Sequence, residues 1–295
     1  MATLYTEQSK NVTKTWVLMT SFFVVIILIG FVFSQAYGNP NILYIFFIFS
    51  IVMNIVAYWQ SDKIAIKMSG AVPADPIQFK DLHNVVENLS ITAGLPKPKV
   101  YIINDPAMNA FATGRNKHHS AVAVTTGLLS ALDRSELEGV IAHELAHIGN
   151  RDILLSTVVV VLAGFISIVS DMFLRSQIFG GSRDSDNKAG GVLLIVGIVL
   201  AILAPIFSML IQLAISRKRE FLADASGALL TRYPEGLARA LTKISQNAQP
   251  MKKASDATAH LFISNPFGRK SLKGFHKLFM THPPVEDRVR ALMVK

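Results

Sequence analysis

The sequence contains no cysteine. This absence excludes disulfide bonds and every metal site built on thiolates. Any site for a transition metal must therefore use histidines and carboxylates, and the 295-residue chain has 8 His and 20 Asp and Glu residues to supply them.

The chain is also poor in charge. Charged residues make up 17% of it, whereas soluble domains average roughly 25%. The hydrophobic content is 51% and the mean hydropathy is +0.40, which together predict a membrane protein. The net charge is +9, and in a membrane protein such an excess is typical of the cytoplasmic flanks of spanning helices. No basic cluster is interleaved with aromatic residues, so nucleic-acid binding is not expected.

Four apolar runs are long enough for a transmembrane helix, which takes about 20 residues. They extend over about 16–33, 42–59, 153–173 and 192–215. We expect the first to be a retained anchor rather than a signal peptide, because it exceeds the roughly 7–15 residues of a signal core and a second run follows at once. The alternative for the last two runs is a buried hairpin of a soluble domain, which their length disfavours.

Lysines at the ends of the first two runs predict the orientation. Lys10 and Lys14 precede the first run, Lys63 and Lys67 follow the second, and the turn between has none. Cytoplasmic loops are the ones enriched in Lys and Arg, so both termini and the polar segments are expected in the cytoplasm. The predicted organisation is a transmembrane hairpin at 1–59, a cytosolic domain in two parts at 60–152 and 216–295, and a second hairpin at 153–215.

Residue spacing predicts the elements of this cytosolic domain. A helix is expected at about 135–150, opened by a capping box of Ser135 and Glu138. Short β-branched runs at 100–103 and 121–126 predict strands. The predicted fold is an α-helical membrane protein with a mainly α (α+β) cytosolic domain.

The segment His143-Glu144-Leu145-Ala146-His147 has the pattern H-E-x-x-H. Residues four positions apart lie on one face of a helix, so both imidazoles can bind one metal ion. Glu144 lies one step round the helix, where it suits a general base better than a ligand. The alternative is a pair of structural histidines on a polar face, which the position of the motif just before an apolar run disfavours.

A catalytic zinc has three protein ligands and one open position. We expect Glu220 to be the third ligand, because it follows the fourth apolar run while His147 precedes the third, and a hairpin brings these two ends together. Asp224 lies one helical turn further on and is expected to accept a hydrogen bond from a ligand histidine. The alternative for both carboxylates is a solvated face paired with Arg217 and Lys218.

The expected cofactor is one Zn²⁺ per subunit, which would polarise a water molecule and the scissile carbonyl while Glu144 takes the proton. His282 is the candidate donor to the oxyanion that follows. Substrate is expected to lie along an exposed strand edge at 121–125, with Asn109 holding its backbone.

Taken together, these motifs make the chain similar to the HtpX family of bacterial membrane zinc proteases, relatives of the CAAX prenyl endopeptidases. The matching segments are Ser61-Asp62-Lys63, Leu95-Pro96 through Asn104-Asp105, Asn109-Ala110-Phe111-Ala112-Thr113-Gly114, the His143 motif, Arg219 to Asp224, and Thr281-His282-Pro283-Pro284. The resemblance implies a gluzincin-type fold with four transmembrane helices, placed in the bacterial inner membrane with its active site facing the cytoplasm. It also implies a role in stress response and protein quality control, with misfolded or damaged membrane proteins, and the protease itself, as substrates. By the same likeness, Asn109 would contact substrate and His282 the oxyanion.

Two other interpretations stay open. In an intramembrane protease the H-E-x-x-H motif would lie inside a span, but here charged residues flank it on both sides. In a non-enzymatic transporter or scaffold the zinc would be structural, which requires four protein ligands and leaves Glu144 without a role. A fourth protein ligand would favour the second interpretation.

Overall fold

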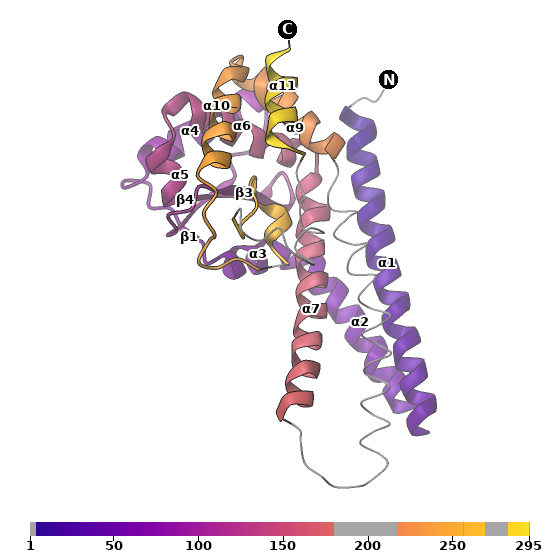
Figure 1. The fold of residues 1–295 in the computed structure, drawn as a ribbon. Helices are drawn as coiled ribbons and strands as arrows, with labels where there is room; N and C mark the ends of the chain where they lie inside the picture. Colours follow the sequence, from indigo (N-terminus) through magenta and orange to yellow (C-terminus); the bar gives the residue numbers. More distant parts are fainter. Residues whose placement is uncertain (1–3, 180–216, 256, 269–282, 295) are drawn as a thin grey trace.

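The computed structural model describes residues 4–179, 217–255, 257–268 and 283–294 (Figure 1). Three long helices pack against one another and extend away from a domain of shorter helices and a small sheet. These long helices are α1 (Leu4–Tyr37), α2 (Asn41–Trp59) and α7 (Asp152–Phe179).

Two of the long helices are apolar enough to cross a membrane, over Gln8–Gln35 and Asn41–Trp59. They contain the runs predicted at 16–33 and 42–59. The first helix, however, is longer than the predicted run, because α1 continues for about three turns before Trp16.

The later apolar runs are only partly described. Helix α7 begins where the third run was expected, and it joins α6 (Arg134–Gly149) at a bend of 84°. The described chain therefore has two candidate spans, or three if this bent pair is counted as one. The run predicted at 192–215 lies outside the described residues.

The hairpin of α1 and α2 turns an apolar surface outward. Tyr44, Ile45 and Ile48 are all largely exposed. Trp16 of α1 and Tyr58, near the C-terminal end of α2, stack with their ring centroids 6.0 Å apart. Large exposed apolar surfaces and terminal aromatic residues are typical of helices in contact with lipid.

A four-stranded sheet has the order β1-β2-β4-β3. Its strands are β1 (Val72–Pro73), β2 (Lys99–Ile103), β3 (Ala110–Asn116) and β4 (His119–Thr125). Strands β2 and β4 are parallel, and the other two pairs are antiparallel. The two predicted strands are confirmed as β2 and β4.

The prediction that 121–125 forms an exposed edge is wrong. Strand β4 lies inside the sheet, between β2 and β3, so both of its backbone edges are paired. The edge strands are β1 and β3, and the outer edge of β3 is partly occupied, because the amide of Ile263 donates to the carbonyl of Ala110. The sequence analysis predicts no strand at 110–116, so it does not place a partner on this side of β4.

Helix α6 occupies the centre of the domain. The other elements are α3 (Ser61–Ser69), α4 (Lys80–Ala93), α5 (Thr126–Ala131), α9 (Arg217–Thr231), α10 (Pro234–Gln246), α11 (Val285–Met293) and the 3-10 turn η1 (Ala259–Leu261). Helices α4, α9 and α10 pack directly on α6, whose Val140, Ile141 and Leu145 are fully buried. A helix buried on nearly all sides is rigidly held, and this fixes the backbone of the H-E-x-x-H motif.

The capping box of α6 is displaced from the predicted one by two residues. Asp133 accepts from the Glu136 amide, and Glu136 accepts from the Asp133 amide, each at 2.9 Å. The sequence carries two overlapping patterns of this kind, and a tertiary contact decides between them. Glu136 is buried and binds Lys243 of α10 at 2.6 Å, whereas Ser135 lies within the first turn.

Candidate metal centre

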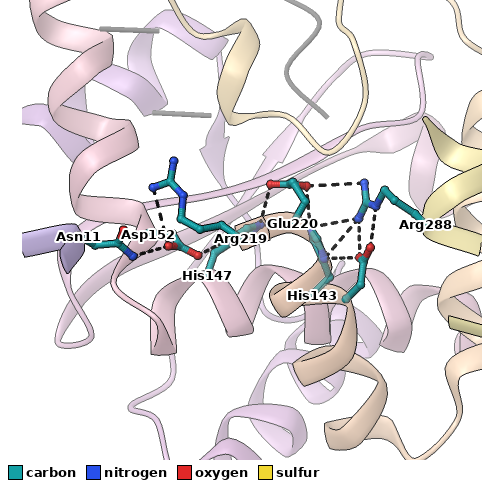
Figure 2. A network of polar contacts seen from close by, with 8 residues as sticks. Asn11, His143, His147, Asp152, Arg219, Glu220 and Arg288 are labelled. Atoms are coloured by element: carbon teal, nitrogen blue, oxygen red, sulfur yellow. Dashed lines mark hydrogen bonds and ion pairs between the residues drawn. The ribbon is translucent and has the colours of Figure 1, made fainter. Parts of the chain in front are cut away.

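The two histidines of the motif lie on one face of α6, as their spacing predicted. Their Nε2 atoms are 3.2 Å apart (Figure 2). His143 and Glu144 are buried, and His147 is partly accessible. The imidazole pair is therefore closed to solvent at His143 and partly open to solvent at His147.

Helix α9 brings Glu220 to the same place. Its Oε1 lies 3.6 Å from Nε2 of His147, and its Oε2 lies 3.9 Å from Nε2 of His143. One ligand atom from each of the three residues can be chosen so that all lie within 4.8 Å of one another. The structure thus brings together the three residues that the sequence named as ligands.

A glycine allows α9 to approach α6 so closely. A Cβ atom on Gly227 would lie 2.9 Å from the backbone nitrogen of His143. Because real Cβ atoms are almost never this close to a neighbour, any larger residue would push the helices apart. Glu220 lies about two turns earlier on the same helix, so its distance to the histidines depends on this contact.

These distances fit a tetrahedral metal ion. Ligand atoms at about 2.1 Å from a tetrahedral zinc are about 3.4 Å from one another. The observed separations of 3.2, 3.6 and 3.9 Å bracket that value. Two nitrogens and a carboxylate oxygen are also ligands that zinc accepts.

The far side of each imidazole is held by a carboxylate. His143 Nδ1 lies 2.9 Å from Asp224, and His147 Nδ1 lies 2.9 Å from Asp152. A proton on each Nδ1 leaves each Nε2 as a lone-pair donor facing the other ligands, as expected for metal-binding histidines. The contact of Asp224 was expected from the sequence, but that of Asp152 was not, because its position before an apolar run resembles an ordinary helix flank.

Arg288 is the second residue that sequence reasoning missed. It donates to both oxygens of Asp224, at 2.8 and 2.6 Å, and its Nη1 lies 3.7 Å from Glu220. Its side chain is only 1% exposed. Arg288 of α11 thus forms an ion pair with both carboxylates. The alternative interpretation had paired them with Arg217 and Lys218. No local pattern indicates which of the 29 Lys and Arg residues pairs with Asp224.

The carboxylates around His147 change its charge. Burial lowers the pKa of His147, but the hydrogen bond to Asp152 and the negative charges of Glu220, Asp152 and Glu144 raise it more, from 6.5 to about 9. In the metal-free protein this imidazole is therefore protonated at neutral pH. A metal ion that uses its Nε2 must displace a proton.

Asp224 is held in its charged form. Burial raises the pKa of Asp224, but the hydrogen bonds from Arg288 and His143 outweigh this effect and lower it from 3.8 to about 2. The carboxylate is therefore ionised over the whole physiological range and can polarise the His143 ring.

Two predicted site residues remain, Asn109 and His282. Asn109 is buried before β3, where it donates to the carbonyl of Ser264 at 2.9 Å and accepts from the Ser264 amide at 3.1 Å. It thus binds the backbone of its own chain in the way that was expected for a substrate, and its role toward substrate stays a prediction. His282 lies outside the described residues.

The chain is similar to known proteins of one peptidase family. The model of peptidase family M48 matches residues 76–294. A "Protease HtpX homolog" from Caldanaerobacter subterraneus subsp. tengcongensis is 50% identical, and the match covers 98% of this chain and 97% of that protein. Proteins of the same name from Thermoanaerobacter pseudethanolicus and Dictyoglomus thermophilum are 49% and 47% identical, each over 98% of this chain and over 97% and 94% of their own lengths. Among solved structures, S. mikatae Ste24p has a similar fold, with a TM-score of 0.50 at 18% identity over 99% of this chain and 67% of that one.

Proposed function

The chain belongs to peptidase family M48 and is a membrane metalloprotease of the HtpX type, and from this premise we propose that it is a zinc-dependent endopeptidase of the bacterial inner membrane. Its proposed substrates are misfolded or damaged membrane proteins, with its own chain among them. The observation that carries the proposal is the meeting of His143, His147 and Glu220 with their ligand atoms within 4.8 Å.

We propose His143, His147 and Glu220 as the ligands of one zinc ion per chain. The choice of zinc rests on the chemistry of the donors, since two imidazoles and one carboxylate form a known catalytic zinc set. Within the described residues the group has three members, and three protein ligands leave a position open for chemistry. This favours a catalytic site over the structural zinc of a transporter or scaffold, which would be closed by four.

Glu144 is the proposed general base. When bound, the ion acts as a Lewis acid toward the scissile carbonyl and the attacking water. Glu144 is buried next to His143 and close enough to His147 to influence its pKa. In this role its carboxylate takes a proton from the water and returns it to the leaving amine. Asp224 and Asp152 keep the proton on Nδ1 of each histidine while this happens.

The oxyanion donor and the substrate contacts are proposed from the sequence. His282 would donate to the developing oxyanion. Asn109 would hold the substrate backbone, which requires that its present bonds to Ser264 be exchanged for bonds to substrate. A substrate strand would add to the outer edge of β3, where Ile263 already bonds to Ala110, since β4 is paired on both sides.

The proposed topology places the site at the cytoplasmic surface. Residues 1–59 and 153–215 would form two transmembrane hairpins of a multi-pass protein with a gluzincin-type domain, formed by 60–152 and 216–295. The two candidate spans within the described N-terminal region support the first hairpin. The charged residues on both sides of the motif support a position beside the membrane rather than within a span.

The test compares the purified full-length protein with the variant Glu144→Gln. Both are given an unstructured substrate tethered to a membrane span, and a tightly folded version of the same substrate serves as the control. We expect wild type to cut only the unstructured form, and Glu144→Gln to keep one zinc per chain while losing about 10²–10⁴-fold in rate. Equal cleavage by the two proteins would refute the role of Glu144. Stable zinc with a fourth protein ligand and no cleavage would support the structural alternative.

A further inference from the structure

Helix α1 is longer than a membrane span requires. Its 34 residues measure about 51 Å, whereas the hydrocarbon core of a bilayer is about 30 Å thick. The part before Trp16 carries Gln8, Asn11 and Thr15, which lie on one face because they are three and four residues apart. Asn11 and Thr15 are each 1% exposed, so this polar face is buried against the protein.

The polar face of α1 contacts the end of the metal-binding helix. Gln8 donates to the carbonyl of Gly149 at 2.6 Å, and Asn11 donates to the carbonyl of Asn150 at 3.2 Å. The last carbonyls of a helix have no partner within it and must find donors elsewhere. The first helix of the chain therefore caps α6 directly after His147.

Asn11 makes a second contact, which leads to the metal site. Its Nδ2 donates to Oδ1 of Asp152 at 2.6 Å, while Oδ2 of the same carboxylate lies 2.9 Å from Nδ1 of His147 (Figure 2). Arg219 also faces this carboxylate, with its Nη1 3.9 Å from Oδ1. Because Asp152 is buried, the direction of its two oxygens is set by these partners rather than by water.

We propose that Asn11 is a positioning residue for the metal ligand His147 and acts through Asp152. The inference rests on the proposed metal site. A carboxylate held by Asn11 at one oxygen presents the other to His147 at a fixed angle, and this orients the ring and its Nε2. The first membrane helix is then a structural part of the metal centre and not only an anchor.

The experiment measures metal retention in the full-length protein in detergent micelles. We compare wild type with Asn11→Ala, Asp152→Ala and the double variant, and record the rate of zinc transfer to a chromophoric chelator. The visible spectrum of the Co²⁺-substituted proteins reports on ligand geometry. Thr15→Val is the matched control, because Thr15 is equally buried on the same face and its hydroxyl donates only within α1, to the carbonyl of Asn11.

A direct partner of a ligand histidine is worth about 10–100-fold in metal affinity, so we expect Asp152→Ala to speed metal loss by that factor. Asn11 contacts the histidine only through Asp152, so Asn11→Ala should speed metal loss less, by about 3–10-fold, and should shift the Co²⁺ spectrum. The double variant should match Asp152→Ala alone, because the proposal assigns the effect of Asn11 on the metal to its bond with that carboxylate and not to its bond with the Asn150 carbonyl. Thr15→Val should behave as wild type.

Three outcomes overturn the proposal. Metal loss from Asn11→Ala at the wild-type rate would show that Asn11 has no effect on the site. Additive effects in the double variant would show that Asn11 acts by packing or through the Asn150 carbonyl and not through Asp152. Wild type that binds no metal would overturn this inference together with the proposed function, whereas the first two outcomes leave the proposed function intact. Should Asn11→Ala not fold, Asn11→Leu keeps the volume without the amide and gives the same measurement.

Discussion

Arg288 donates two hydrogen bonds to Asp224, and this pair connects the C-terminal helix α11 to the metal centre. Both side chains are almost fully buried. Asp224 also lies 2.9 Å from Nδ1 of His143. The carboxylate is thus shared between a guanidinium that keeps it charged and an imidazole that it orients.

Replacing Arg288 by Met is expected to leave a buried carboxylate without its cation. Loss of one partner of a buried pair costs about 3–5 kcal/mol in the free energy of unfolding. Arg288→Lys keeps the charge but not the two parallel bonds, so its free energy of unfolding should lie between those of wild type and Arg288→Met. The measurement is thermal unfolding of the metal-free protein. The control is Arg290→Met, which removes an exposed arginine of the same helix and should change little; equal stability of the two Met variants would contradict the prediction.

Glu220→Gln is expected to remove metal without unfolding the chain. A neutral amide keeps the size of the side chain but is a far weaker ligand for zinc than a carboxylate. Zinc content after dialysis should fall well below one per chain, and proteolysis should fall with it. Glu138→Gln, on the outer part of α6 beside Arg134, serves as the control and should keep the zinc content and the proteolytic activity of wild type. Full zinc in Glu220→Gln would show that another residue is the third ligand.

Gly227→Ala is expected to move Glu220 away from the histidines. The new Cβ would lie 2.9 Å from the His143 backbone nitrogen, and such overpacking costs about 1–3 kcal/mol. Both stability and zinc affinity should therefore fall. Gly149→Ala is the control, because the nearest atom to its Cβ is a leucine methyl at 3.8 Å. A Gly227→Ala protein with wild-type zinc affinity would mean that the close crossing of α6 and α9 is not needed.

Metal binding should strengthen as the pH rises toward 9. The pKa of His147 is raised to about 9 in the metal-free protein, so zinc competes with a proton below that value. Affinity should increase by up to about tenfold per pH unit and then level off. The folded-state pKa lies above the unfolded value, so His147 stabilises the metal-free protein fully below pH 6.5 and loses this effect as the pH rises through 9. Chelator competition and unfolding of the metal-free protein at several pH values test both signs.

The absence of native cysteine makes the proposed orientation directly testable. Single cysteines can be placed at Asn39, in the exposed turn between α1 and α2, and at Ile77, which is 88% exposed and belongs to the domain of shorter helices and the sheet. In intact spheroplasts an impermeant maleimide should label Asn39→Cys but not Ile77→Cys. Both should react after permeabilisation. The reverse pattern would place the metal site outside the cytoplasm.

Local features of this molecule could be predicted because neighbouring residues determine them. The i, i+4 spacing of His143 and His147 places both rings on one helix face wherever that helix lies. Runs of apolar residues give the long helices α1 and α2 by length alone. Even the proximity of Glu220 followed from simple topology. The predicted capping box was wrong because two overlapping patterns satisfy the same local rule. The contact of Glu136 with Lys243 stabilises the other one.

The sequence by itself determined the chemistry of the site: which residue types are available, which two share a helix face, and which third carboxylate returns to them. Only the tertiary structure decided what supports that chemistry. Arg288 and Asp224 are 64 positions apart, and Asn11 and Asp152 are 141 apart, so no local periodicity links them. The physical reason is that a buried charge must find its partner among all the surfaces that fold against it, and that choice depends on how α1, α6, α9 and α11 pack.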